Sequence, residues 1–313
     1  MNARQTAPLP VICLAGPTGS GKTVTALALA ERLNGEVVNA DSRQVYADFP
    51  CITAQPTGLE QAQCPHHLYG FLPCTQKINA GRWVDQATQV VRHILHRGKT
   101  PLLVGGTGFY FHALLHGMAA IPAIDPTLTA HLTERALSEG IPQLHAELAN
   151  VDPTYAAKIH PNDRQRIVRA LEVFLGTGHT LSWWHTNAAE PPLCTGPLLL
   201  LDATLAWLEP RLARRQQIML AAGALDEART AFEHCSDASA PGWSGIGCAE
   251  MLAFLCGSID WQTCLNLWLH NTRAYAKRQL TWFHARPEAV RLPPDAIEIA
   301  LRTAEKHWRS IAP

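Results

Sequence analysis

The 313-residue sequence predicts an α/β protein in which helices flank a parallel sheet. Three short apolar runs, at residues 9–15, 101–104 and 198–201, have the length and composition of buried strands. The first two run into glycine-rich turns, and helical spacing of apolar residues follows each turn. Strands that alternate with helices in this way are typical of a parallel sheet covered by helices.

A second region interrupts this pattern. Between residues 121 and 187 no run resembles a strand, whereas Asp125-Pro126 and Asp152-Pro153 are typical of helix starts with proline at the first helical position. Strand-like sequence returns near residue 198. We therefore expect a discontinuous α/β core and a helical insertion, with these bounds: 1–117 and 196–313 for the core, 118–195 for the insertion.

The first glycine-rich turn carries the strongest motif. It reads Gly16, Pro17, Thr18, Gly19, Ser20, Gly21, Lys22, Thr23. A strand, Gly-x-x-x-x-Gly-Lys-Thr and a helix together indicate a phosphate-binding P-loop, so the core is expected to be P-loop NTPase-like. The glycines allow backbone N–H groups to point inward, and the helix N-terminus adds positive potential. Lys22 would reach the terminal phosphates and the Thr23 hydroxyl would ligate Mg²⁺. The alternative, a glycine-rich turn without a ligand, is weaker in this context.

Composition narrows the class of protein. Hydrophobic residues make up 47% and charged residues 17%, which is typical of a soluble globular protein. Lys+Arg and Asp+Glu both number 26, so no global field attracts a polyanion, although local arginine patches remain possible. The nine cysteines include no Cys-x-x-Cys, and no apolar run approaches ~18 residues. We expect a reduced, cytoplasmic protein without a membrane segment.

Two further stretches are candidates for the site. Asp41 follows the β-prone run 36–40, and residues just past a strand in a parallel sheet face the ligand crevice. An Asp-Ser pair is also an ordinary turn or helix cap, and position alone does not separate the two interpretations. The turn at 105–110 is a second glycine-rich connection, but glycines there also serve helix–strand packing.

The remaining chain is expected to be mostly helical. Residues 47–77 have no sustained period and are interpreted as loop. Helices are expected at 78–97, 163–176, 207–223, 226–232, 249–255 and 259–284, with a closing strand at 290–292. The helix that follows Asp163 carries Arg164, Arg166 and Arg169, and such a basic face is by itself more often solvated surface. Trp183-Trp184 would either stack on bases or pack internally.

Taken together, six stretches resemble the tRNA dimethylallyltransferases, which place an isopentenyl group on the adenosine beside the anticodon. The matching stretches are 16–23, 41–46, 66–68, 104–110, 160–173 and 272–283, in the family's order. The resemblance covers nearly the whole chain and is of the bacterial type, because the zinc finger of eukaryotic members is absent. It implies transfer of a dimethylallyl group from dimethylallyl diphosphate to N6 of adenosine 37 in tRNA.

The resemblance also implies roles for individual residues. Asp41 would accept the proton of the amine, Thr107 would contact the flipped nucleotide, and Arg215 would meet the departing diphosphate, with Arg211 and Arg214 as near alternatives. Mg²⁺ would bind at Thr23. The anticodon stem-loop would be held by these residues: Asp41, Ser42, Arg43, Gln44, Thr107, Thr129, Gln165, Arg166, Ile167, Val168, Arg169, Lys277 and Arg278. We expect a monomer.

Several positions depart from the family's pattern. They are Ile52, Gln55, Tyr69, Thr129, Gln217 and Cys248. None lies in the P-loop or at Asp41, so the expected reaction is unaffected. Two other functions would share the phosphate site: a small-molecule kinase, which has no use for the arginine-bearing insertion, and an RNA-binding P-loop module without turnover, which does not require Asp41.

Overall fold

The structure is a computed structural model that describes residues 7–312. The chain forms two compact units, of which the first comprises residues 1–115 and 193–313 and the second residues 116–192. The boundaries expected from the sequence are 117/118 and 195/196. Each unit has its own hydrophobic core.

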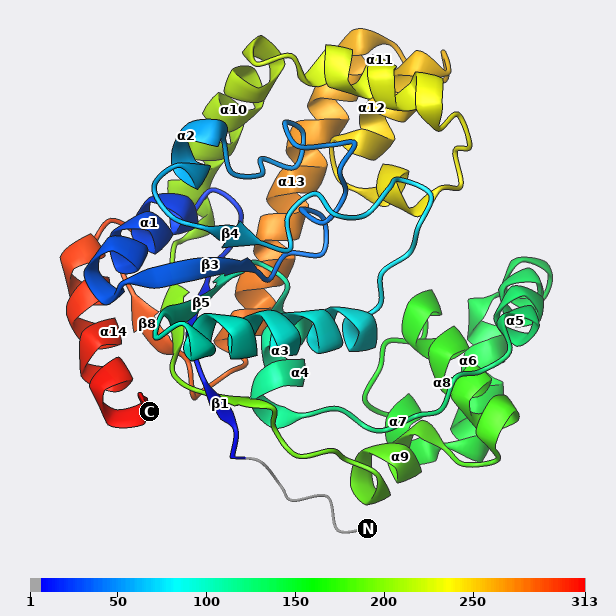
Figure 1. Ribbon diagram of the computed structural model, residues 1–313. Coiled ribbons are helices and arrows are strands. Elements are labelled where there is room, and N and C mark those ends of the chain that lie inside the picture. Colours follow the sequence, from blue (N-terminus) through cyan, green and yellow to red (C-terminus); the bar gives the residue numbers. More distant parts are fainter. Residues whose placement is uncertain (1–6, 313) are drawn as a thin grey trace. The chain divides into compact units, whose positions relative to one another are not determined.

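A six-stranded parallel sheet forms the centre of the first unit (Figure 1). Its strands, in spatial order, are β4 (His66–His67), β3 (Gly35–Asn39), β5 (Thr100–Gly105), β2 (Ile12–Ala15), β7 (Leu198–Leu201) and β8 (Val290–Leu292). Every adjacent pair is parallel, and Leu14 lies opposite both Val104 and Leu199. A separate parallel pair joins β1 (Leu9–Pro10) to β6 (Cys194–Thr195). The predicted α/β class with a parallel sheet is confirmed.

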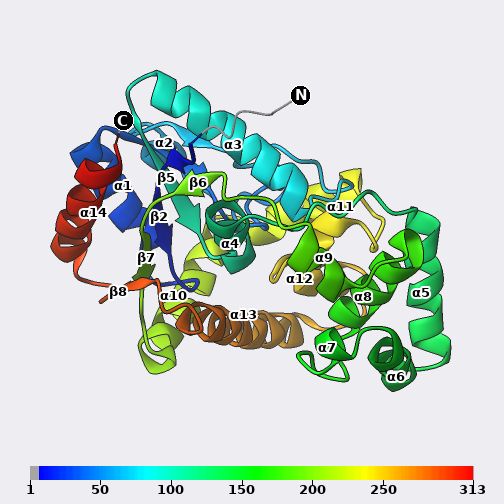
Figure 2. The same ribbon diagram turned by 90° about the horizontal axis from the view of Figure 1, so that it is seen from below.

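Helices cover both faces of this sheet (Figure 2). One face packs against α1 (Lys22–Leu33) and α14 (Ile297–Ile311), which contribute the small residues Ala26, Ala30, Ala300 and Ala304 to the core. The other face is covered by α3 (Ala80–His96) and α4 (Gly108–His116). Because the central strands are buried on both faces, they are continuous apolar runs rather than alternating ones.

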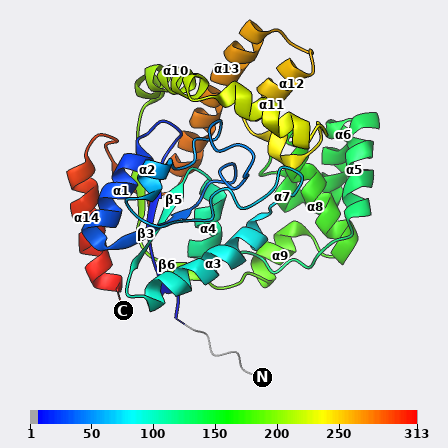
Figure 3. The same cartoon turned by 45° about the horizontal axis from the view of Figure 1, so that its top comes forward.

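A cluster of helices forms a second core within the same unit (Figure 3). It consists of α10 (Leu205–Ala221), α11 (Ala224–His234), the 3₁₀ helix Pro241–Ser244, α12 (Cys248–Leu255) and α13 (Trp261–His284). The buried Phe49 and Trp243 pack edge to face, with ring centroids 4.8 Å apart. This contact joins the 47–53 segment to the helical cluster.

The second unit is helical. It contains α5 (Pro126–Ser138), α6 (Ile141–Val151), α7 (Pro153–Ala156), α8 (Arg164–Thr177) and α9 (Leu181–Asn187). Asp125, Asp152 and Asp163 cap α5, α7 and α8 by accepting backbone N–H bonds. Asp152 also accepts a bond from Ser182 N, which connects α7 to α9.

The structure adds elements that the sequence did not predict. The segment 47–77, interpreted as loop, contains α2 (Gly58–Gln61) and the edge strand β4, and both are too short to show a period. The helices α6, α9 and α14 were also not anticipated. In α14 the buried residues are Ala300, Leu301 and Ala304, and the small alanine side chains allow close approach to α1.

Candidate active site

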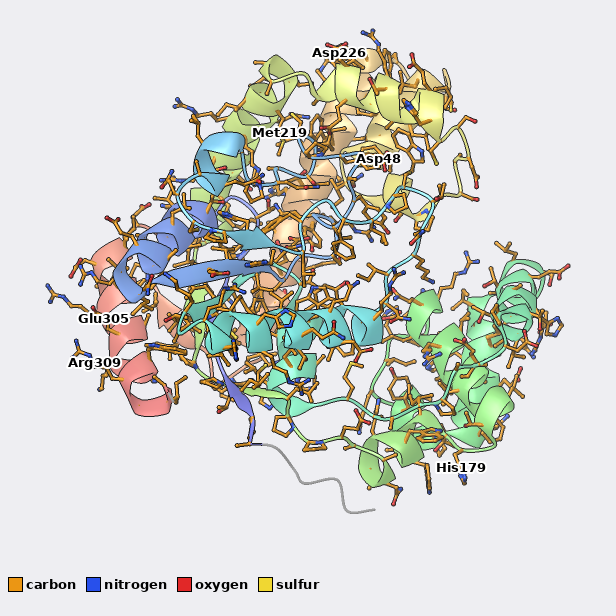
Figure 4. All side chains as sticks on the ribbon, in the orientation of Figure 1. Asp48, His179, Met219, Asp226, Glu305 and Arg309 are labelled. Carbon is orange, nitrogen blue, oxygen red and sulfur yellow. The ribbon has the colours of Figure 1, made fainter. Side chains whose placement is uncertain are left out.

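Three strand ends in the first unit converge on one cavity. Strand β2 leads into the P-loop, β3 leads to Asp41, and β5 leads to Gly106 and Thr107. Because the strands are parallel, their carboxyl ends meet at one edge of the sheet. The cavity has a volume of about 320 Å³, which suits a small ligand. Its lining includes Thr18 to Val24, Asp41 and Arg215, with an apolar side formed by Ile52, Met219, Ile246, Trp268 and Leu269. Met219 extends from α10 (Figure 4).

The P-loop has the backbone conformation that its sequence requires. Gly19 and Gly21 adopt φ values of 82° and 88°, in the left-handed region, and Gly21 is the N-cap of α1. Lys22 Nζ donates hydrogen bonds to the carbonyl oxygens of Gly16 and Pro17, each at 2.9 Å. The lysine thus holds the loop closed around its own ammonium group, next to the positive end of α1.

The charges around the cavity influence one another. Desolvation in the crowded loop lowers the pKa of Lys22 to about 8; the Asp41 carboxylate opposes this shift, and the Arg215 guanidinium adds to it. Burial also lowers the pKa of Arg215, whereas Asp41 and Glu60 act to raise it. Two cations and one carboxylate therefore share a poorly solvated space, and the excess positive charge favours an anionic ligand.

Asp41 is held in one orientation by its neighbours. Its Oδ1 accepts a hydrogen bond from Arg43 N at 2.9 Å, and its own N–H donates to Asn39 Oδ1 at 2.8 Å. Its Oδ2 lies on the side of Gly106, 3.4 Å from the position that a Cβ on that glycine would occupy. One oxygen thus serves the turn while the other is directed toward the second glycine-rich turn. The two interpretations of Asp41, turn-former and reactive carboxylate, are compatible in this geometry.

The second glycine-rich turn is tied to Asp41's segment. Thr107 Oγ1 accepts a hydrogen bond from Ser42 N at 2.9 Å, and Thr107 N donates to Ala40 O at 3.1 Å. The Tyr275 hydroxyl on α13 is hydrogen-bonded to the Thr107 side chain, and burial raises the pKa of Tyr275. Thr107 is therefore positioned from two directions, by the 40–42 segment and by α13.

Of the three candidate arginines on α10, Arg215 alone is among the residues that line this cavity. Arg211 instead stacks over the Trp207 ring, 3.5 Å from its centroid, and forms an ion pair with Asp295. Arg214 is exposed. Arg211 and Arg215 are one helical turn apart, but they have different neighbours. The sequence does not show which neighbours each of them has.

The other residues of the first unit that were expected to contact RNA differ in whether they line the cavity and in whether their side chains are already hydrogen-bonded. Arg43 and Arg278 line the cavity, and Arg43 Nη1 donates to Ser244 Oγ at 2.8 Å. Gln44 also lines it, but its Nε2 donates to the carbonyl oxygens of Thr53 and Ala54. Lys277 is exposed on α13 and is not among the lining residues.

In the second unit, the expected RNA contacts on α8 fall into two groups. Gln165, Arg166 and Arg169 are exposed. Arg166 is paired with Asp163, and Arg169 with the buried Glu172, whose carboxylate also accepts from Thr129 Oγ1 at 2.7 Å.

Ile167 and Val168 differ from these neighbours. Their side chains are 0% and 8% exposed and belong to the core of the unit. Helical periodicity turns both side chains inward, so the expected RNA contact at these two positions would have to be made by the backbone.

The two tryptophans at 183–184, expected either to stack on bases or to pack internally, differ in their environments. Trp184 packs against the core of the second unit, and its Nε1 donates to Thr177 Oγ1 at 3.0 Å. Trp183 is 39% exposed and stacks on His179, with ring centroids 4.0 Å apart. His179 lies at the surface of the second unit (Figure 4).

Gln279 is a site residue that sequence reasoning missed. It is 5% exposed and hydrogen-bonded to both glycine-rich turns. It lies in the stretch 272–283 that matched the family, but no local signal shows that its amide points inward.

Among the departures from the family's pattern, Gln55 donates to Tyr46 O at 2.7 Å and so braces the loop near Gln44, while Ile52 and Cys248 are buried. Tyr69 lines the cavity.

No helix within residues 7–312 is long and apolar enough to cross a membrane. The fold and the cavity define a P-loop protein whose phosphate loop faces a carboxylate and a second glycine-rich turn. The IPP transferase profile matches residues 44–286. The tRNA dimethylallyltransferase of Desulfovibrio desulfuricans is 65% identical over 306 residues, covering 96% of this chain and 95% of the relative. That of Nitratidesulfovibrio vulgaris is 59% identical over 295 residues, covering 94% and 96%.

Solved structures agree with these matches. The full-length tRNA isopentenylpyrophosphate transferase of Bacillus halodurans superimposes with a TM-score of 0.68 at 31% identity, over 95% of both chains. A eukaryotic dimethylallyltransferase acting on tRNA gives a TM-score of 0.77 at 29% identity, over 97% of this chain and 78% of that one. The chain belongs to the IPP transferase family, as the sequence resemblance predicted.

Proposed function

We propose that this protein is a tRNA dimethylallyltransferase that transfers the dimethylallyl group of dimethylallyl diphosphate to N6 of adenosine 37 and releases diphosphate. One observation carries the proposal: in a chain of this family, the P-loop and Asp41 line the same cavity, and Thr107 is hydrogen-bonded to Ser42, the residue next to Asp41. That cavity would hold the diphosphate at one end and admit a base at the other.

The proposed reaction begins with the diphosphate. The N–H groups of the P-loop other than those of Thr18 and Ser20, which donate to Gln279 Oε1 and Pro17 O, would bind its oxygens together with the α1 N-terminus. Lys22 would exchange its bonds to Gly16 O and Pro17 O for bonds to phosphate. Arg215 would neutralise the charge that develops as the C1–O bond breaks. The excess positive charge of this space supports that role.

The acceptor amine requires a base. As the N6–C1 bond forms, the exocyclic amine loses a proton, and the free oxygen of Asp41 is the proposed acceptor. The adenine must first leave the anticodon-loop stack to enter the cavity. Thr107, positioned beside Ser42, is proposed to bind the flipped nucleotide.

The donor set is compatible with Mg²⁺. No group of three or more His, Cys, Asp or Glu side chains among residues 7–312 could hold a metal on its own, whereas Thr23 and Asp41 supply hard oxygen atoms to the cavity. Mg²⁺ is usually bound by one or two protein ligands together with phosphate oxygens and water, so Thr23 is the proposed ligand. When bound, the ion would offset the charge of the diphosphate.

The anticodon stem-loop is the proposed RNA partner. The exposed Gln165, Arg166 and Arg169 of α8 and the cavity-lining Arg43 and Arg278 are proposed contacts. A net charge of zero is compatible with this, because a specific stem-loop requires a few clustered arginines rather than a uniformly basic surface.

The test is incorporation of radiolabel from dimethylallyl diphosphate into unmodified tRNA, with transfer of phosphate from ATP to small acceptors measured in parallel. We expect label in tRNA and none in ATP-dependent products. Phosphate transfer without prenyl transfer would instead identify a kinase, and binding of tRNA without either reaction would identify an RNA-binding module.

A further inference from the structure

Helix α13 contacts the two glycine-rich turns at once, through a single side chain. The Gln279 Oε1 accepts a hydrogen bond from Thr18 N at 2.9 Å, and its Nε2 donates one to Gly106 O at 3.0 Å. The partners fix the orientation of the amide, because Thr18 N–H needs an acceptor and the Gly106 carbonyl needs a donor. Gln279 is 261 residues from Thr18 and 173 residues from Gly106 in the sequence.

The fit around this amide is close. A Cβ at Gly106 would lie 2.1 Å from Gln279 Nε2, so residue 106 must be glycine for the contact to exist. The same imaginary Cβ would lie 3.4 Å from Asp41 Oδ2. Gln279 thus touches the backbone beside Asp41 on one side and the phosphate loop on the other.

We propose that Gln279 is a positioning residue that sets the distance between the diphosphate loop and the turn carrying Thr107. This proposal rests on the proposed function. Prenyl transfer joins an atom attached to the diphosphate with an atom of the base, so the two binding loops must be held at the distance of an in-line attack. A misplacement of about 1 Å can cost on the order of 10²-fold in rate. Gln279 touches neither reacting group and acts only through the two loops.

The variant Gln279→Met tests the proposal, because methionine retains the length and volume of the side chain and removes both hydrogen bonds. The matched control is Asn271→Leu, on the same helix, which removes a part-buried amide bonded to Glu250 Oε1 at 2.6 Å. Single-turnover prenyl transfer is measured at saturating tRNA and dimethylallyl diphosphate, well below the unfolding temperature of each variant.

We expect Gln279→Met to lower the single-turnover rate about 10- to 100-fold, with the dissociation constants of inorganic diphosphate and of tRNA changed less than about threefold. Asn271→Leu should retain the rate within about threefold. A Gln279→Met rate within threefold of the wild type, or an equal loss in both variants, would overturn the proposal and leave Gln279 as a structural amide.

A second measurement separates this proposal from the proposed function. Hydrogen exchange of residues 16–23 and 104–109 is followed while inorganic diphosphate with Mg²⁺ is added. In the wild type both segments should exchange more slowly; in Gln279→Met only residues 16–23 should. If the wild type transfers no prenyl group, the proposed function is wrong, and hydrogen exchange alone then tests the role of Gln279. Slower exchange of both segments in Gln279→Met would show that Gln279 does not couple the two turns.

Discussion

The two glycine-rich turns of the core are alike in sequence context, since each follows a buried strand and begins a helix, but their glycines serve different purposes. In the P-loop, Gly21 has a φ of 88°, and the nearest atom to an added Cβ is Pro294 O at 3.9 Å. In the second turn, Gly108 has no positive φ, but a Cβ there would lie 2.1 Å from the Trp282 ring.

This difference distinguishes a local requirement from a tertiary one. The P-loop needs glycine because its own backbone adopts a left-handed conformation, which any protein with this motif shares. At Gly106 and Gly108 the second turn needs glycine because side chains of α13, more than 160 residues later in the chain, occupy the space. The first turn is therefore organised by its backbone, and the second by packing against α13.

The largest expected effect lies at the residue between the two turns. Asp41→Asn preserves shape and the hydrogen bond to Arg43 N but cannot accept a proton. Single-turnover transfer at saturating tRNA should fall ~10²–10⁴-fold while tRNA binding survives. A loss within about threefold would make Asp41 a turn-former, and normal chemistry with weakened binding would make it an RNA anchor.

The next effect tests the P-loop. Lys22→Ala removes the ammonium proposed to bind the diphosphate, and Thr23→Ala removes the proposed Mg²⁺ ligand. Each should reduce kcat/KM for dimethylallyl diphosphate about 10²-fold, the magnitude typical of losing one preorganised charge or donor. Steady-state kinetics with both variants checks this. Wild-type turnover in both would mean that the diphosphate binds elsewhere.

A pair of alanine substitutions tests the comparison itself. Gly108→Ala should destabilise the fold by about 3 kcal/mol through overlap with the indole, and Gly21→Ala by about 1–2 kcal/mol through backbone strain. In a Trp282→Leu background, Gly108→Ala should lose most of its destabilising effect, whereas Gly21→Ala should keep all of its effect. Denaturant unfolding of the wild type, of Trp282→Leu and of the two glycine variants in each background measures this. Equal costs in both backgrounds would contradict the steric origin.

The second unit offers a smaller effect, remote in sequence from either turn. Replacing Arg166 and Arg169 together by glutamine should weaken tRNA binding about tenfold and make its salt dependence shallower, because fewer phosphate contacts release counterions. Filter binding over a series of salt concentrations is the measurement. Unchanged affinity and slope would return α8 to the solvated-surface interpretation.

The smallest expected effect is a pH dependence. Because the pKa of Lys22 is lowered to about 8, its ammonium is fully charged only below that pH. Affinity for inorganic diphosphate should fall about fivefold or more from pH 7 to 9 relative to Lys22→Arg, which stays charged. The ratio of the diphosphate affinities of the wild type and Lys22→Arg cancels the titration of diphosphate itself. Calorimetry measures both affinities, and a ratio that stays constant from pH 7 to 9 would show that Lys22 keeps its ordinary pKa.

The sequence by itself determined the features that depend on short stretches of chain. The P-loop, the strand at 101–104, and the caps Asp125 and Asp152 are local, because backbone conformation and capping need only neighbouring residues. The run 9–15, expected as one strand, is divided between β1 and β2, which belong to different sheets. The family followed from the order of six such stretches.

The tertiary structure alone decided which side chains meet. It joined both glycine-rich turns through Gln279, and among the three arginines of α10 that the sequence left as candidates it placed Arg215 at the cavity. These outcomes depend on which side of a helix faces which neighbour, and on contacts between residues more than a hundred positions apart. No local pattern encodes such contacts, since hydrogen bonds and packing act on distance in space and not on distance along the chain.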